Sequence, residues 1–230
     1  MSLSDNVGHI QGPALRKVKP VRRTQAERSA ETQAKILAAT ITCIDKLGYG
    51  NTTFRRVARE AGITVGAVQH YYLSKTELLM AVIDSGFADL AQRLDDTSFK
   101  HGSLEERIDG FVDHMWEHCA SPTYQSNIQI LFGLQHEKRT GDATWLDLPL
   151  TKFSLRARDM WMEIFATTGL SENAHAELLH YVFASISGSA QLFRVSKLQR
   201  RVNSDLRLLK KLIFNTFTEV AAKNSLPASS

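Results

Sequence analysis

The sequence predicts an all-α protein of about nine helices in two helical parts, and three observations lead to this fold class. Apolar residues recur at helical spacing along most of the chain, no segment alternates convincingly as a strand, and capping residues and glycines separate the helical stretches. Hydrophobic residues make up 43% of the chain and charged residues 23%, which is typical of a folded globular protein and unlike a disordered one.

The amino-terminal segment is basic and lacks apolar periodicity. Basic side chains lie among its glycines and prolines at Arg16, Lys17, Lys19, Arg22 and Arg23. We therefore expect residues 1–28 to form a flexible basic arm. From Ala30 the apolar residues fall at helical spacing as far as Leu47, and Gly48 ends this first helix.

Two short helices follow, separated by a tight turn. Thr53 is placed to cap a helix over 54–61 that Gly62 closes, and Thr64 is placed to cap a second one that runs through Tyr72. This is the spacing of a helix-turn-helix, in which the first helix supports the second so that the second lies in the major groove of DNA.

The excess of positive charge lies at the same end of the chain. Residues 1–84 carry 12 basic and 7 acidic side chains, whereas residues 85–230 carry 16 and 17. A front part with a net charge of +5 favours a polyanion as its partner.

The cysteine content and the hydropathy bear on where the protein works. Cys43 and Cys119 are too few for a disulfide framework or a four-thiolate zinc site, which fits a reducing compartment. The longest apolar run, over 78–83, is far too short to span a membrane, and the first residues do not resemble a signal peptide. We expect a cytoplasmic protein that has no membrane partner.

The remainder of the chain predicts further helices. Ser74 and Glu77 fit a capping box for a helix from Lys75 to about Asp95, which joins the front to the rest without a flexible linker. Movement at its far end is expected to reach the front, and Gly86 is expected to ease its bending. More helices are expected over 103–119, 124–140, 150–168, 172–195 and 203–223. These patterns predict one helical domain over 29–75 and another over 76–225.

Residues 52–84, TTFRRVAREAGITVGAVQHYYLSKTELLMAVID, resemble the DNA-binding region of the TetR family of transcriptional regulators. The resemblance covers residues 30–84 closely, and beyond them it extends only to the helical layout. It implies a regulator that binds double-stranded DNA through residues 29–75. It also implies that the second domain binds a small organic inducer and forms a homodimer.

The resemblance also implies which residues contact DNA. The recognition helix would present Thr64, Val65, Gly66, Ala67, Gln69, His70 and Tyr71, while Val68 and Tyr72 face the core. The Gln69 amide suits an adenine edge, although a solvated surface amide is the alternative. By family position Tyr71, Thr53 and Lys75 would contact phosphate, with core packing as the alternative for Tyr71. Arg55 is either a phosphate contact or part of a solvated helix face.

Residues between 100 and 195 are expected to enclose the inducer. The candidates are polar or aromatic side chains on the helices that correspond to the family's ligand domain: His114, Trp116, His118, Phe132 and His136. We expect the homodimer to form through 172–195 and 203–223, because small residues around Gly188 permit close helix approach and an apolar stripe follows on the last helix. That stripe consists of Leu206, Leu209, Ile213, Phe217 and Val220, and its alternative role is core packing within one subunit.

One motif suggests a different function. His114, Glu117 and His118 match the H-x-x-E-H string of zinc metalloproteases, so a zinc-dependent hydrolase is the alternative hypothesis. Zinc catalysis needs a third protein ligand and a cleft beside a substrate-binding strand, and no strand is predicted. We therefore favour a ligand-responsive repressor that an inducer releases from a palindromic operator, with no metal, no cofactor and no catalysis.

Overall fold

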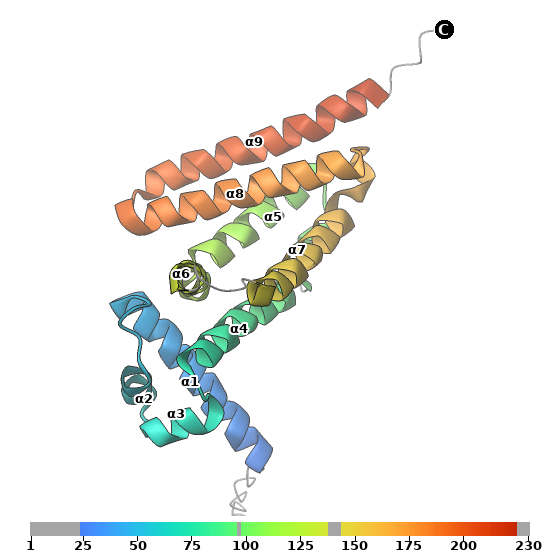
Figure 1. The fold of residues 1–230 in the computed structure, drawn as a ribbon. Helices are drawn as coiled ribbons and strands as arrows, with labels where there is room; N and C mark the ends of the chain where they lie inside the picture. The colour runs from blue at the N-terminus through green and yellow to red at the C-terminus, as the bar shows by residue number, and fades with distance from the viewer. Residues whose placement is uncertain (1–23, 96–97, 138–143, 225–230) are drawn as a thin grey trace, which may run out of the picture.

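The computed structural model describes residues 24–95, 98–137 and 144–224, which form nine α-helices and two short 3-10 helices (Figure 1). No strand is present in these described ranges, and the predicted all-α class is confirmed. The predicted basic arm lies outside the described residues up to position 23. None of the described helices is long and apolar enough to cross a membrane.

Helix α1 (Gln25–Leu47) begins at Gln25 rather than at the predicted Ala30. The Thr24 hydroxyl accepts a hydrogen bond from the Glu27 backbone N–H at 3.1 Å, and the Glu27 carboxylate accepts one from the Thr24 backbone N–H at 2.7 Å. This capping box satisfies two backbone donors that a helix otherwise leaves without partners. Residues 25–28 are therefore helical and do not belong to an arm.

Helices α2 (Phe54–Ala61) and α3 (Val65–Tyr71) form the predicted helix-turn-helix. Gly62 ends α2 with φ of +68°, a conformation that glycine adopts without the steric cost of a Cβ. Helices α1, α2 and α3 and the start of α4 (Lys75–Asp95) enclose a small core, whose buried members are Ile36, Ala39, Cys43, Val57, Ala58, Val68, Tyr72 and Leu78.

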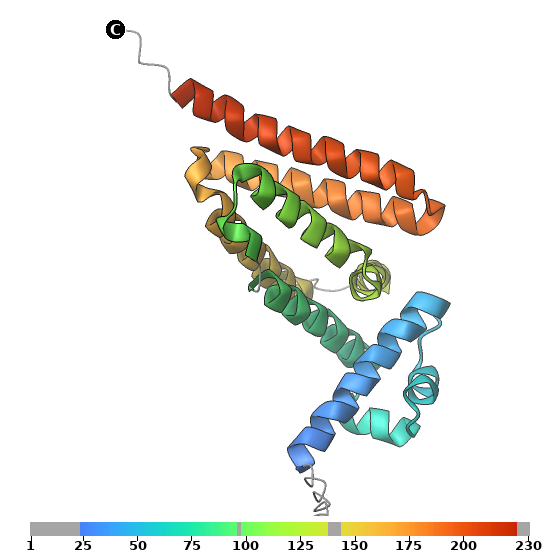
Figure 2. The same ribbon diagram turned by 180° about the vertical axis from the view of Figure 1, so that it is seen from behind.

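The second part of the molecule contains five further helices, α5 (Leu104–Ala120), α6 (Pro122–Glu137), α7 (Thr144–Phe165), α8 (Glu172–Ser196) and α9 (Gln199–Asn224). Short 3-10 turns precede α5 and follow α7. Both views show α8 and α9 side by side, running in opposite directions at the end of the molecule farthest from α3 (Figures 1 and 2).

In the second part of the molecule, three helices start two or more residues before the predicted position. The chain begins α6 at Pro122, because proline suits the first helical position and the Ser121 hydroxyl accepts a hydrogen bond from the Tyr124 N–H at 3.2 Å. Helix α7 begins at Thr144 instead of residue 150. Helix α9 begins at Gln199, because Lys197 takes a left-handed conformation (φ +55°) that turns the chain sharply after α8.

The two parts share a packed junction rather than a single connecting helix. Ile44 of α1, Leu79 and Ile83 of α4, and Ile130 and Leu134 of α6 are buried together there. Helix α4 also contributes Leu78 to the amino-terminal core and Leu90 to the carboxy-terminal one. Helix α6 thus packs against both α1 and α4, whereas the sequence predicted a connection through α4 alone.

Gly86 of α4 has a different role from the predicted one. It is buried where α6 crosses α4, and a Cβ at this position would clash with the Asn127 amide and come within 3.1 Å of the Thr123 methyl carbon. The glycine therefore permits close packing of α4 on α6, and helix bending is not needed to explain it.

Candidate functional site

Helix α3 presents one face to solvent at the end of the molecule opposite α9 (Figure 1). Val65, Gly66, Gln69 and His70 are exposed, whereas Val68 is completely buried. Tyr72, which caps the helix, is also buried. These orientations agree with the predicted division into an outer and an inner face, and they make the outer face available to the major groove.

Two predicted contact residues also cap their helices. The Thr53 hydroxyl accepts a hydrogen bond from the Arg56 N–H at 3.4 Å, and the Thr64 hydroxyl accepts one from the Ala67 N–H at 3.1 Å. Both hydroxyls are exposed, so each retains capacity for a phosphate oxygen. Around Gly66 a Cβ would find open space, with only the Thr64 hydroxyl at 4.0 Å.

Three predicted contacts are not equally accessible. Tyr71 is partly buried against the amino-terminal core, and its ring lies edge-on to His70 at 5.2 Å. Lys75 is also half-buried, because its ammonium group donates to the Tyr49 carbonyl at 3.2 Å and lies 4.4 Å from the centre of the Tyr49 ring. Arg55 is exposed and forms no ion pair with any described residue. Lys75 therefore holds the loop before α2, and its role toward phosphate stays a prediction.

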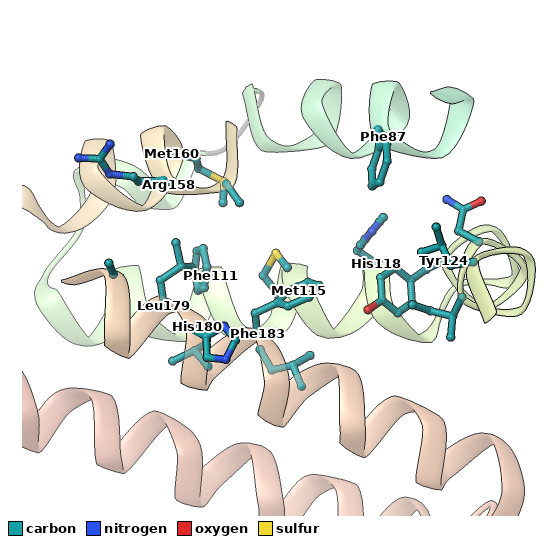
Figure 3. A pocket seen from close by; sticks show the side chains of 17 residues that line it. Phe87, Phe111, Met115, His118, Tyr124, Arg158, Met160, Leu179, His180 and Phe183 are labelled. Carbon is teal, nitrogen blue, oxygen red and sulfur yellow. The ribbon is translucent and has the colours of Figure 1, made fainter. Parts of the chain in front are cut away.

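A cavity of about 450 Å³ lies within the second part of the molecule. Helices α4 to α8 all contribute to its wall, so it is formed by tertiary packing (Figure 3). The wall is mostly apolar and includes Phe87, Phe111, Met115, Tyr124 and Phe183. Enclosed apolar cavities of this size with a few polar groups are typical of small-molecule sites.

Only one of the predicted ligand residues with a described side chain lines this cavity, namely His118. The side chain of Phe132 is 68% exposed on the outer face of α6, and Trp116 packs edge-on against Phe193 at 5.8 Å. His114 is outside the lining, and the side chain of His136 lies outside the described residues. Helical periodicity predicted which face of α5 is apolar but not which face of α6 points inward. Phe132 was therefore predicted to line the ligand site, but it lies outside the cavity.

Two groups at the cavity that could act as nucleophiles are held in their neutral forms. Burial raises the pKa of the Cys119 thiol to about 12, so this cysteine stays a neutral thiol beside the cavity. Burial also raises the pKa of Tyr124, whose hydroxyl lies 2.7 Å from the Ser187 hydroxyl. Neither group is an activated nucleophile at neutral pH.

The alternative zinc site is not formed. His118 is buried against the cavity, whereas Glu117 of the same string is exposed to solvent. Throughout the described part of the chain, no three His, Cys, Asp or Glu side chains come together in a way that would hold a metal ion. A catalytic zinc needs three protein ligands, and this helix supplies no such set.

The exposed apolar face of α8 and α9 includes the predicted surface around Gly188 of α8 but not the predicted stripe of α9. Val182, Leu206, Leu209, Ile213 and Phe217 are buried in the core of their own subunit. The exposed apolar side chains on these two helices and the turn between them are instead Tyr181, Leu192, Val195, Leu198, Leu208, Leu212 and Phe214. Each of these helices has two apolar stripes, and the sequence alone did not indicate which stripe faces the core.

The chain is similar to known regulators. Residues 36–82 match the family described as "Bacterial regulatory proteins, tetR family". The HTH-type transcriptional regulator CymR of Pseudomonas putida is 25% identical over 173 residues, which cover 75% of this chain and 84% of that protein. The regulator TtgR of Pseudomonas putida is 40% identical over 65 residues, which cover 28% of this chain and 30% of that protein.

Solved structures show the same fold. A transcriptional regulator from Rhodococcus superposes with a TM-score of 0.64 at 16% identity over 80% of this chain and 96% of its own. A TetR transcriptional regulator from Legionella pneumophila gives a TM-score of 0.61 at 16% identity over 84% of this chain and 98% of its own.

The helix-turn-helix, the helical domain behind it and these relatives together define a DNA-binding transcriptional regulator. Its DNA-binding part, residues 36–82, is that of a TetR-family transcriptional regulator. The protein is a regulator and not an enzyme, and the zinc-hydrolase hypothesis is therefore wrong.

Proposed function

We propose that this regulator is a repressor that a small organic inducer releases from a palindromic operator. The observation that carries the proposal is the position of the cavity: Phe87 lines it from α4, and the same helix begins directly after the recognition helix. A ligand that favours one position of α4 would change the spacing of the recognition helices. A cytoplasmic location, with access to chromosomal DNA, is part of this proposal.

A second connection supports this coupling. Arg194 near the end of α8 forms an ion pair with Asp45 of α1, with the Arg194 Nη1 2.7 Å from the Asp45 Oδ1. The hydroxyl of Ser126 in α6 donates to the Ile41 carbonyl of α1 at 3.4 Å. Two helices that line the cavity are thus also bonded to the helix that supports the DNA-binding part.

We also propose that the protein works as a homodimer through α8 and α9. The exposed apolar face on these helices includes a shallow groove around Gly188, where no atom lies within 4 Å of an added Cβ. Apolar faces of this kind are typical of subunit interfaces, and a two-fold dimer presents two recognition helices to a palindrome.

The proposal concerning DNA assigns base contacts to the exposed face of α3. Gln69 would bond an adenine edge, Val65 would contact a thymine methyl group, and Gly66 would let the DNA backbone approach closely. The hydroxyls of Thr53 and Thr64 and the guanidinium of Arg55 would contact phosphates.

Thermodynamic linkage tests the proposed function. Operator DNA is first selected from genomic fragments at low salt, and a compound that releases it is found by screening. Calorimetry then measures the compound's affinity for the free protein and for the protein bound to operator. A coupling of about 1 to 3 kcal/mol would weaken the compound on the complex roughly 5- to 150-fold, because coupling is reciprocal. Equal affinities in the two titrations, or a protein that selects no DNA, would contradict the proposal.

A further inference from the structure

The polar groups of the cavity wall are few and mostly engaged. The Tyr124 hydroxyl is paired with Ser187, as described above. Arg158 is half-exposed, and its guanidinium lies 3.6 Å from the Glu172 carboxylate. Figure 3 shows this guanidinium pointing away from Phe87, His118 and Tyr124. Among the described lining residues there is no carboxylate. The remaining titratable groups of the wall are the imidazoles of His118, which is buried, and His180, which is exposed. No side chain in the deep part of the cavity therefore carries a permanent charge that would balance a charged ligand.

Asn127 is the exception among these polar groups. Its side chain lines the cavity from α6 and is only 4% exposed, and its Oδ1 atom is fully buried without a hydrogen-bond partner. A buried amide oxygen that lacks a donor loses the hydrogen bonds that water gave it in the unfolded chain. The same amide packs directly against Gly86 of α4. The cavity wall therefore contains an unpaired acceptor at the contact between α6 and α4.

We propose that Asn127 is the polar anchor of the inducer, and that the inducer is an uncharged, mostly apolar molecule with one hydrogen-bond donor, a hydroxyl or an N–H. The donor bonds the Asn127 Oδ1, and the apolar body packs against Phe111, Met115 and Phe183. This inference rests on the proposed ligand-responsive function. Its reason is complementarity: a donor satisfies the open acceptor, whereas a buried anion or cation would lose its hydration without a counter-charge.

Three probes of similar shape test this assignment in calorimetric titrations of the full chain. They are 2-naphthol, which has a donor, 2-methoxynaphthalene, which has an oxygen but no donor, and 2-naphthoate, which is an anion. We expect 2-naphthol to bind about tenfold more tightly than either of the others, the usual size of one net hydrogen bond. In Asn127→Leu this preference disappears, and 2-methoxynaphthalene binds at least as tightly as 2-naphthol.

A matched variant and two controls accompany this test. Leu131→Val removes one methylene from the same wall without changing its polarity, and it should weaken all three probes alike. Thermal unfolding and operator binding of each variant show that the fold and the DNA-binding part are intact. Tightest binding of 2-naphthoate, a preference for 2-naphthol that survives Asn127→Leu, or no binding of any probe would overturn the assignment. Intact operator binding in those cases would show that the DNA-binding function itself stands.

Discussion

Gln69 lies on the exposed face of the recognition helix, one turn beyond Val65, and its side-chain amide forms no hydrogen bond with any described residue. Its amide is therefore available to a base edge. In Gln69→Ala we expect a loss of discrimination of about 1 to 3 kcal/mol at one base pair, with little change in binding to unrelated DNA. Fluorescence anisotropy with single-base operator variants measures this loss.

The control for this substitution is Gln33→Ala, which removes an exposed amide from α1. It should leave the affinity for every operator variant unchanged. An equal loss of affinity on all sequences in Gln69→Ala would contradict a base contact and indicate a contact with the DNA backbone instead.

His175 is a buried residue whose protonation opposes folding. The Trp161 indole N–H donates to its Nδ1 at 3.0 Å, and burial lowers the pKa of His175 below its ordinary value. Folded His175 therefore takes up its proton at a lower pH than the unfolded chain does. The contribution of neutral His175 to the free energy of unfolding is full above the ordinary histidine pKa. It falls as the pH drops through that value and levels off below the pKa of the folded state.

We expect the free energy of unfolding to decrease between pH 7.5 and 5.5 more in the wild type than in His175→Gln, which does not titrate but retains an acceptor for Trp161. Urea denaturation at both pH values measures the difference. Identical losses in the two proteins would show that His175 does not cause the acid sensitivity.

At the scale of elements, the contact between α6 and the loop after α1 depends on a glycine. A Cβ at Gly133 would lie 2.5 Å from two carbons of the Tyr49 ring. The Tyr49 ring of this loop therefore packs directly on the backbone of α6 at a position where a larger residue would clash. Tyr49 in turn holds Lys75 at the start of α4. Gly133 therefore sets the position of the helix-turn-helix relative to α6.

In Gly133→Ala the methyl group must displace Tyr49, and overpacking of this kind typically costs about 1 to 3 kcal/mol. We expect a lower melting temperature and a changed operator affinity, because the loop before α2 shifts. Thermal unfolding and anisotropy measure the two effects. Gly50→Ala is the control, since a Cβ there meets nothing within 4 Å. Unchanged stability and affinity in Gly133→Ala would show that Tyr49 yields without moving the loop.

At the scale of the whole molecule, the apolar face of α8 and α9 predicts self-association. Leu192 is 68% exposed and Leu212 is 42% exposed, and both line the groove around Gly188. Because neither side chain belongs to the subunit's core, Leu192→Glu with Leu212→Glu should leave the fold intact and place charge in the interface. We expect a dimer for the wild type and a monomer for the double variant in light scattering at micromolar concentration.

Leu155→Glu is the control for this double variant, because it adds charge at an exposed leucine that belongs to α7 and not to α8 or α9. It should remain a dimer. A monomeric wild type, or a double variant with the mass of a dimer, would refute the interface on α8 and α9.

The local structure of the DNA-binding part could be predicted from its sequence. Thr53, Gly62 and Thr64 mark helix boundaries through interactions with neighbouring residues, and the periodicity of Val68 and Tyr72 defines an inner face within a short segment. Caps, turns and amphipathic faces depend on residues close in sequence, so they were predictable. The family resemblance came from this same segment.

The cavity and the exposed apolar face of α8 and α9 depend on tertiary packing and could not be predicted from local sequence. Helices α6, α8 and α9 carry apolar residues on more than one side, and only their packing selects which side of α6 and α8 lines the cavity and which side of α9 faces the core. Phe132 was therefore expected inside but lies outside, and Asn127 became a wall residue although no sequence pattern marks it. Gly86 likewise acquires its role from a partner 41 positions away, Asn127, and contacts across such separations leave no periodic signal in the sequence.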